Sequence, residues 1–325
     1  MVASGIAINQ IPGVSVQRMA ELAQEAERLG FNRCWVCDQG LDCHDIFVTL
    51  TAAALQTGSI RLGTGITHPY ARHPAVTAAG IASLDELSGG RAFLGLGAGG
   101  IDTLSPMGLK RQKPLAAVRE TIQIVRALGG GSPVDFDGEV FRLHGAYLDY
   151  ARCDMEIWVA GRGPRMRALG GGLADGVVFE FVHKDMLAGD IARVRQAAAQ
   201  QGNRPRICYA TMVVVDDRTL DKVRPALFWR LADAPPELRA QLGVSDTDVT
   251  AMRQAMASGG FPAVARLIKD DWVRPFVIMG SVEECAAELH RLITDLAIDE
   301  FQLPILDMES APALMATVAR MVAVA

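Results

Sequence analysis

One segment combines glycine, proline and arginine in an order that suits anion binding. It reads Gly161-Arg-Gly-Pro-Arg-Met166 and lies between a predicted strand and a predicted helix. Consecutive backbone N–H groups at the start of a helix attract anions, and a nearby arginine adds positive charge. Glycine before a helix is more commonly a simple turn, so this segment by itself is only a candidate anion site.

Titratable side chains follow another predicted strand. Glu180 and His183 come directly after the apolar run 176–179, and both residue types can carry a proton. Two further histidines, His68 and His73, lie in a glycine- and proline-rich loop. Because an isolated loop histidine is usually solvated or hydrogen-bonded, a structural role is the alternative. We keep Glu180 and His183 as candidate proton carriers.

Closely spaced thiols raise the question of a metal site. Cys34 and Cys37 are separated by two residues, and Cys43-His44 follows. Such a pair can bind zinc or exchange disulfides. The pair falls on an apolar strand, without the second ligand pair that a closed structural site requires. We therefore favour buried thiols and expect no metal.

Hydrophobic periodicity predicts strands that alternate with amphipathic helices along the chain. Eight such strands correspond to the (β/α)8 arrangement, a TIM barrel whose active site lies at the C-terminal ends of the strands. The predicted strands are Gly5–Asn9, Phe31–Val36, Ser59–Leu62, Ala92–Leu96, Ile157–Ala160, Gly176–Phe179, Arg206–Val215 and Phe301–Leu303.

Two segments interrupt the alternation. Residues 133–150 contain Asp137-Gly138 between two alternating runs, which predicts a β-hairpin insertion after the fourth helix. Residues 217–275 are too long for one barrel helix and predict several helices inserted before the eighth strand. We expect a single domain over residues 1–325, with the helix Arg111–Leu128 before the hairpin.

Composition narrows the class of protein. The chain has 325 residues, of which 50% are hydrophobic and 21% charged, so a full core can be buried. A net charge of -5 argues against a broad nucleic-acid surface. No apolar run is long enough to span a bilayer, and no signal peptide is visible at the N-terminus. The six cysteines then indicate reduced thiols and a cytoplasmic protein.

Three ordered motifs resemble the bacterial luciferase-like superfamily. They are Pro69-Tyr-Ala-Arg-His-Pro74, Leu84-Asp-Glu-Leu-Ser-Gly-Gly-Arg91 and Leu94-Gly-Leu-Gly97. The Arg-His-Pro form is similar to the branch that uses the deazaflavin coenzyme F420, which includes methylenetetrahydromethanopterin reductases. The resemblance implies a luciferase-like TIM barrel over nearly the whole chain.

The resemblance also implies a cofactor and the residues that hold it. The cofactor would be coenzyme F420, with FMN as the alternative. A non-proline cis peptide at Gly65–Ile66 would pack against the deazaflavin ring, and the loop after strand five would bind the phosphate of the cofactor tail. The implied cofactor-binding residues are Asp38, Gly65, Ile66, Thr67, Gly97, Ala98, Gly99, Gly161, Gly163, Pro164, Arg165 and Met166.

Several positions depart from the pattern of that branch. Relatives typically carry histidine where this chain has Gln39, and glutamine donates a hydrogen bond but cannot carry a proton at neutral pH. Residues 97–102 lack the glutamate of alcohol-oxidising relatives, and Ala7 lies where pterin reductases carry glutamate. These departures leave the substrate open, with Gln39, Glu180 and His183 as the candidate catalytic residues.

The implied function is hydride transfer between C5 of coenzyme F420 and a small organic substrate with a C=N, C=C or carbonyl/alcohol group. One alternative is an FMN-dependent monooxygenase of the same superfamily. Another is a barrel that has lost catalysis and serves as a binding or scaffold protein. Relatives commonly form dimers, so a homodimer is expected, with a small molecule as ligand and neither nucleic acid nor membrane as partner.

Overall fold

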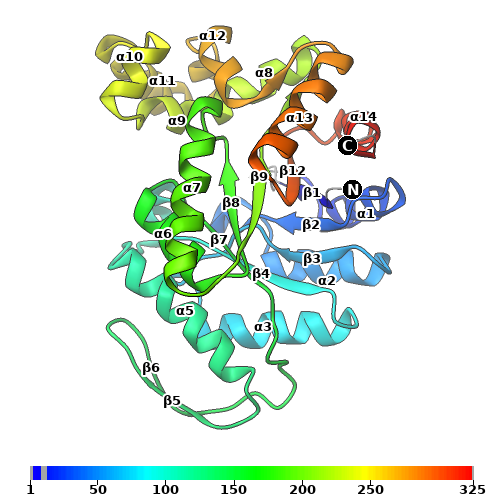
Figure 1. The fold of residues 1–325 in the computed structure, drawn as a ribbon, viewed down its shortest axis with the longest axis vertical. Helices are drawn as coiled ribbons and strands as arrows, with labels where there is room; N and C mark the ends of the chain where they lie inside the picture. Colours follow the sequence, from blue (N-terminus) through cyan, green and yellow to red (C-terminus); the bar gives the residue numbers. More distant parts are fainter. Residues whose placement is uncertain (1–2, 9–12, 324–325) are drawn as a thin grey trace.

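The parallel strands of the chain close into a barrel in a computed structural model that describes residues 3–8 and 13–323. Around the barrel the strand order is β1-β12-β9-β8-β7-β4-β3-β2. The (β/α)8 prediction is confirmed (Figure 1). The barrel strands are β1 (Ala3–Ile8), β2 (Arg33–Val36), β3 (Arg61–Thr64), β4 (Ala92–Leu96), β7 (Ile157–Ala160), β8 (Gly176–Glu180), β9 (Arg206–Ala210) and β12 (Glu300–Ile305).

Helices pack around the outside of these strands, and local capping decides where several of them begin. Ser15 accepts a hydrogen bond from Arg18 N, and Asp45 accepts from Phe47 N and Val48 N. Such side-chain acceptors satisfy N–H groups that have no partner inside the helix. The surrounding helices are α1 (Val16–Arg28), α2 (Ile46–Gln56), α3 (Pro74–Leu87), α5 (Pro114–Leu128), α6 (Pro164–Leu173), α7 (Lys184–Gln200), α13 (Val282–Leu296) and α14 (Ala311–Ala323).

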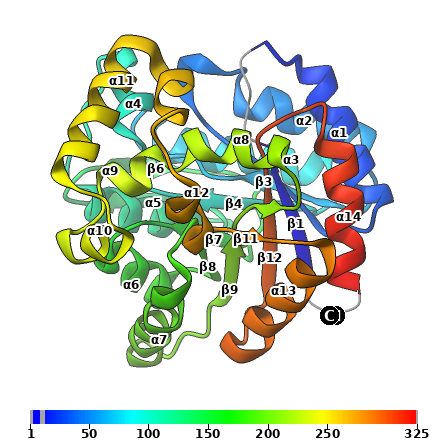
Figure 2. The same ribbon diagram turned by 90° about the horizontal axis from the view of Figure 1, so that it is seen from above.

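The two interruptions form separate features at the edges of the barrel. An antiparallel hairpin, β5 (Val134–Asp137) and β6 (Arg142–Ala146), lies between α5 and β7. Further helices gather on the side toward which β8 points, and Figure 2 shows them from above. They are α8 (Asp217–Ala226), α9 (Phe228–Ala232), α10 (Pro236–Leu242), α11 (Asp246–Ala265) and α12 (Asp270–Val273).

Aromatic side chains fill the barrel interior. Trp35 meets Phe93 edge-on at a centroid distance of 4.4 Å and Trp158 at 5.4 Å. Glycine makes room for them, because a Cβ on Gly63 would lie 2.4 Å from the Phe93 ring and one on Gly176 would lie 2.2 Å from Trp158. The interior is therefore a packed core, as in other TIM barrels.

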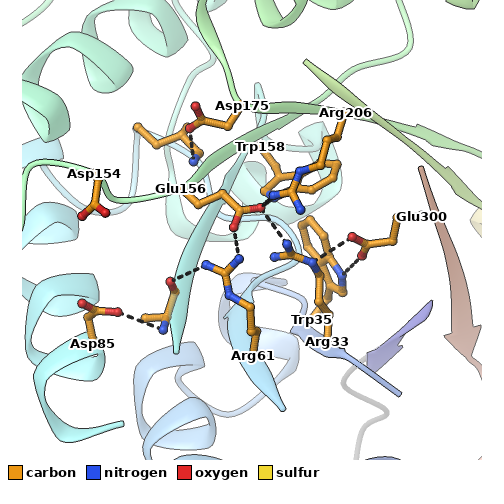
Figure 3. Close-up of polar contacts among 12 residues, drawn as sticks. Arg33, Trp35, Arg61, Asp85, Asp154, Glu156, Trp158, Asp175, Arg206 and Glu300 are labelled. Atoms are coloured by element: carbon orange, nitrogen blue, oxygen red, sulfur yellow. Dashed lines mark hydrogen bonds and ion pairs between the residues drawn. The ribbon is translucent and has the colours of Figure 1, made fainter. Parts of the chain in front are cut away.

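An ionic network occupies the N-terminal end of the barrel (Figure 3). Glu156 pairs with Arg33 at 2.8 Å and also with Arg61 and Arg206, while Arg33 pairs with Glu300 at 2.8 Å. Burial raises the pKa of Glu300, although the nearby arginines and Trp35 oppose that shift. Charges that are buried this deeply remain compatible with folding only when they are paired.

Several predicted boundaries were wrong. Strand three was predicted at Ser59–Leu62, but the structure places it at Arg61–Thr64, and strand two begins at Arg33 rather than at Phe31. Helix α5 begins at Pro114 because Lys113 adopts a left-handed conformation with φ of 43°. The predicted end of strand one at Asn9 lies outside the described residues.

Strand seven was predicted as one strand, Arg206–Val215, and this is wrong. The barrel strand ends at Ala210, where the Thr211 hydroxyl donates to the carbonyl of Phe276 at 2.6 Å. Residues Val213–Val214 form β10, which pairs in parallel with an unpredicted strand β11 (Ile278–Met279). The chain thus leaves the barrel to join the helical segment.

Candidate functional site

The loops after β2 and β3 are joined by a charged contact at the C-terminal end of the barrel. Asp38 Oδ2 accepts from the Thr67 hydroxyl at 2.6 Å and from Arg72 Nη1 at 2.8 Å. The same guanidinium pairs with Asp45, the N-cap of α2. Asp38 and Thr67, which are candidate cofactor-binding residues, therefore form one polar unit that is anchored by Arg72.

The peptide bond between Gly65 and Ile66 is cis, which confirms the prediction. Its surroundings are tight, since a Cβ on Gly65 would lie 2.5 Å from Trp35 Cβ. The Gly65 carbonyl accepts from the Cys37 thiol at 2.9 Å. Thr67 N then donates to Gly95 O, and Gly97 N donates to Thr67 O, each at 3.0 Å.

Gly97, Ala98 and Gly99 follow β4, and Gly97 contacts the cis-peptide segment directly. A Cβ on Gly97 would lie 2.1 Å from Ile66 Cδ1 and 3.1 Å from the Ala160 carbonyl oxygen. Only glycine allows this close approach of backbone to side chain. The Gly97 backbone thus brings together the ends of β3, β4 and β7.

The candidate phosphate loop precedes α6. Gly163 is the N-cap of α6 and Pro164 its first residue, and no side chain caps the helix start. Arg165 is exposed, and nothing lies within 4 Å of a Cβ built on Gly163. Helix N–H groups that lack a side-chain cap remain available to an anion.

Met166 and Arg167 of α6 hold Gly161, the first residue of that loop, in place. Met166 packs on Gly161, where a Cβ would lie 2.5 Å from Met166 Cγ. Arg167 Nε donates to the Gly161 carbonyl at 2.9 Å, and its guanidinium pairs with the buried Asp190 of α7. The sequence reasoning did not find Arg167, because its partner lies on the next helix.

Glu180 lies at the end of β8 and is paired with the helical segment. Its carboxylate contacts Arg230 Nη2 of α9 at 3.0 Å. Burial raises the pKa of the Cys37 thiol, and the negative charge of Glu180 adds to that shift. No sequence signal pointed to Arg230.

The other two candidate catalytic residues, His183 and Gln39, differ in burial and in the contacts that they make. His183 is buried and caps α7 by accepting from Asp185 N, and its ring meets Phe276 edge-on at 5.4 Å. Burial lowers the pKa of His183. Gln39 is exposed, and its Oε1 accepts from the Cys43 thiol at 3.1 Å.

The cysteine thiols and the charged side chains Asp85 and Arg91 lie in contacts that support the fold. Burial raises the pKa of Cys34 to about 12. In the described part of the chain, no group of three or more His, Cys, Asp or Glu side chains is arranged to hold a metal. Asp85 pairs with Arg152 at 2.6 Å, and Arg91 donates to the backbone carbonyls of Ile60 and Ala54.

Sequence comparison places the chain among known proteins. A family described as luciferase-like monooxygenase matches residues 3–300. The 5,10-methylenetetrahydromethanopterin reductase of Methanolobus tindarius is 31% identical over 88% of this chain and 90% of its own length. The protein of the same name from Archaeoglobus fulgidus is 32% identical, over 88% of this chain and 89% of its own length.

Solved structures share the fold. The coenzyme F420-dependent tetrahydromethanopterin reductase of Methanopyrus kandleri matches with a TM-score of 0.86 and 25% identity, and the match covers 97% of each chain. An F420-dependent secondary alcohol dehydrogenase matches with a TM-score of 0.79 and 21% identity over 99% of each chain. At that lower identity the second likeness concerns the fold alone.

Proposed function

The chain belongs to the luciferase-like family of proteins, and from this membership we propose that it is an oxidoreductase that uses coenzyme F420. The proposal rests on one structural observation above all: the ends of β3, β4 and β7 meet around the cis-peptide segment and Gly97. Relatives that match the chain over most of their length are named methylenetetrahydromethanopterin reductases, and a structural relative is named as F420-dependent.

The residues present fit such a cofactor. The uncapped start of α6, with the exposed Arg165 beside it, suits the phosphate of the cofactor tail. The backbone at Gly65–Ile66, supported by Gly97, offers a surface for one face of a flat ring. Thr67 and Asp38 would bind polar atoms of the ring, with Arg72 holding the Asp38 carboxylate in place.

When bound, reduced coenzyme F420 supplies a hydride from C5 of its deazaflavin ring. The protein's own contribution is to bind the tail, orient the ring and keep the polar groups of the site in place. Glu180, His183 and Gln39 remain the proposed catalytic residues. Glu180 would exchange a proton with the substrate, held by Arg230, and Gln39 would donate a hydrogen bond.

We propose a small organic substrate with a C=N, C=C or carbonyl/alcohol group. The absence of glutamate from residues 97–102 and the presence of Ala7 in the buried barrel core mean that the relatives' own substrates do not transfer directly. Loops decide substrate choice in this kind of barrel.

An FMN-dependent monooxygenase is the second candidate, since the matching family is described as luciferase-like monooxygenase. Titration of the purified protein with coenzyme F420 and with FMN, under identical conditions, separates the two. We expect the lower dissociation constant for coenzyme F420. A lower value for FMN would overturn the cofactor assignment, and binding of neither would favour the non-catalytic barrel.

We also propose a homodimer in the cytoplasm. Val48 and Leu55 of α2 and Val76 and Leu87 of α3 are each more than half exposed, which is unusual for large apolar side chains on neighbouring helices. A second copy is the partner we propose, because symmetric dimers are the commonest assembly. In the described residues no helix is long and apolar enough to cross a membrane, and the six cysteines form no disulfide.

A further inference from the structure

His68 lies beneath the loop that follows β4, among the residues proposed to hold the cofactor. Only 3% of its surface is exposed. A Cβ on Gly99 would lie 3.2 Å from His68 Cγ, so the backbone of that loop rests against the imidazole. Its ring is stacked on Tyr70 at a centroid distance of 6.2 Å. His68 also follows Thr67, which binds Asp38.

The hydrogen bonds of His68 define which ring nitrogen carries a proton. The backbone N–H of Tyr70 donates to Nδ1 at 3.3 Å, so Nδ1 is an acceptor and a neutral ring must carry its proton on Nε2. Burial lowers the pKa of His68, with Asp38 opposing and Arg72 supporting that shift. The side chain is therefore a neutral imidazole with a fixed Nε2–H donor.

The Nε2–H donor of His68 has no acceptor in the described residues. Within residues 3–8 and 13–323, no atom accepts a hydrogen bond from Nε2, which is itself buried. A buried donor without a partner destabilises the fold, so proteins rarely keep one that binds neither a ligand nor an ordered water. Asp38 is the carboxylate that influences the pKa of His68, but its Oδ2 accepts from Thr67 and Arg72 and no hydrogen bond to Nε2 is formed.

We propose that His68 Nε2–H donates a hydrogen bond to a carbonyl-type acceptor on the ring of the bound cofactor and favours the reduced form of that ring. The proposal rests on the cofactor-binding function proposed above. Negative charge that develops on a ring oxygen during reduction is stabilised by a preorganised neutral donor in a dry site.

The test compares His68→Asn with wild type. Asparagine can accept from the N–H two residues ahead and so keeps the Tyr70 contact, but it has no atom at the position of Nε2. His73→Asn is the matched control, because His73 Nδ1 also accepts from the N–H two residues ahead, at the exposed N-cap of α3. Dissociation constants are measured for the oxidised and the reduced cofactor, together with thermal unfolding of the ligand-free protein.

We expect His68→Asn to weaken binding of the reduced cofactor about tenfold and of the oxidised cofactor less, because the lost bond is charge-assisted only in the reduced form. The unfolding midpoint of the ligand-free variant should stay equal or rise, because an unpartnered buried donor has been removed. His73→Asn should change neither dissociation constant.

Nitrogen NMR of histidine-labelled protein determines independently which ring nitrogen of His68 carries the proton and whether the cofactor contacts it. With six histidines in the chain, the His68 signal is the one missing from His68→Asn. We expect the Nε2–H tautomer near neutral pH and a shift of Nε2 when oxidised coenzyme F420 is added. If FMN binds and coenzyme F420 does not, the cofactor assignment fails, and the same comparison with FMN still decides the role of His68.

Four outcomes would overturn the inference. A lower unfolding midpoint with unchanged dissociation constants would mean that Nε2 binds a structural water. If the NMR spectrum shows the proton of His68 on Nδ1, then Nε2 cannot donate a hydrogen bond to the cofactor. Equal losses for oxidised and reduced cofactor would show that His68 only shapes the loop, and failure of both cofactors to bind wild type would leave its N–H without a ligand acceptor.

Discussion

Arg165 carries the most direct prediction at the residue scale. Its guanidinium is exposed beside the uncapped start of α6, so Arg165→Ala should remove one charge-assisted contact to the cofactor phosphate without disturbing the core. Such a contact contributes about 1.5–3 kcal/mol, which corresponds to a loss of about tenfold or more in affinity. Cofactor titration at low and moderate salt measures it.

Arg142→Ala is the control, since Arg142 is also exposed but lies on the hairpin and pairs with Asp137. Its affinity for cofactor should match that of wild type. If Arg165→Ala also binds like wild type at both salt concentrations, the side chain does not reach the cofactor tail.

The hydrogen bonds of Glu27 should make the stability of the fold depend on pH. Burial by itself would raise its pKa, but hydrogen bonds from the N–H groups of Ile60, Ser59 and Gly58 outweigh burial and lower the pKa to about 2. A carboxylate with a lowered folded-state pKa stabilises the fold above its unfolded-state value and loses that contribution as pH falls. The loss should therefore occur between about pH 4.5 and pH 2.

Urea unfolding of Glu27→Gln measures this contribution. At pH 7 the variant should be less stable by about 1 kcal/mol. Hydrogen bonds to a charged group contribute about 1.5–3 kcal/mol, and solvent around the partly exposed Glu27 reduces that contribution. The difference from wild type should shrink as pH falls below 4.5. Glu25→Gln, on the same helix, serves as the control. A difference that stays constant from pH 7 to pH 3 would contradict the assignment.

At the scale of elements, the hairpin β5–β6 is held by one buried carboxylate. Glu120 of α5 is 2% exposed and accepts from Glu139 N at 2.8 Å and from Val140 N and Phe141 N at 3.0 Å. Gly138 fits against it, since a Cβ there would lie 2.3 Å from Glu120 Oε2. The hairpin turn thus depends on a helix that precedes it in the chain.

Glu120→Ala should release the hairpin tip. Three N–H groups lose their acceptor, and we expect faster proteolytic cleavage near residue 139 and a loss of about 1.5–3 kcal/mol in stability. Arg119→Ala is the matched variant, because it removes only the exposed pair with Glu139 and should cleave like wild type. Equal cleavage of both variants would mean that Glu120 does not hold the turn.

At the scale of the whole molecule, we expect one end of the barrel to contribute stability and the other end to bind the cofactor. The N-terminal end carries the Glu156 network, whereas the proposed site lies at the C-terminal end. Glu156→Gln leaves Arg33, Arg61 and Arg206 without their shared carboxylate and should destabilise the fold by about 3–5 kcal/mol. The cofactor dissociation constant of the folded variant should not change.

Thermal unfolding and titration together check that separation. Asp154→Asn is the control, since Asp154 pairs with Arg152 at the surface, and its unfolding midpoint should match that of wild type. A variant Glu156→Gln that loses cofactor affinity while fully folded would show that the two ends of the barrel are coupled.

The proposed dimer gives the last prediction. Leu55 is 71% exposed on α2, and Leu55→Glu should disrupt a dimer formed through α2 and α3. Light scattering should then change from twice the chain mass to a particle of 34.8 kDa. Leu267→Glu, at a partly exposed site after α11, should leave the dimer intact. A wild-type protein that is monomeric at every concentration rules out the proposal.

Local signals in the sequence were enough for much of the fold. Ser15, Asp45 and Ser281 cap helices where their side chains predict, because a cap requires only the next three residues. β4 and β7 have the predicted bounds, because buried parallel strands read as continuous apolar runs. The division into a single domain, with insertions at 133–150 and 217–275, stays a prediction, as do the roles of the site residues.

The sequence by itself determined the alternation of strands and helices, and with it the end of the barrel where a site can form. Only the tertiary structure decided which charges meet: Glu180 with Arg230, Asp38 with Arg72, and Glu156 with three arginines from other strands. It alone showed that His68 Nε2 has no partner in the described residues. The physical reason is range, since capping and periodicity act within a few residues, whereas these contacts form only when the closed barrel brings distant segments together.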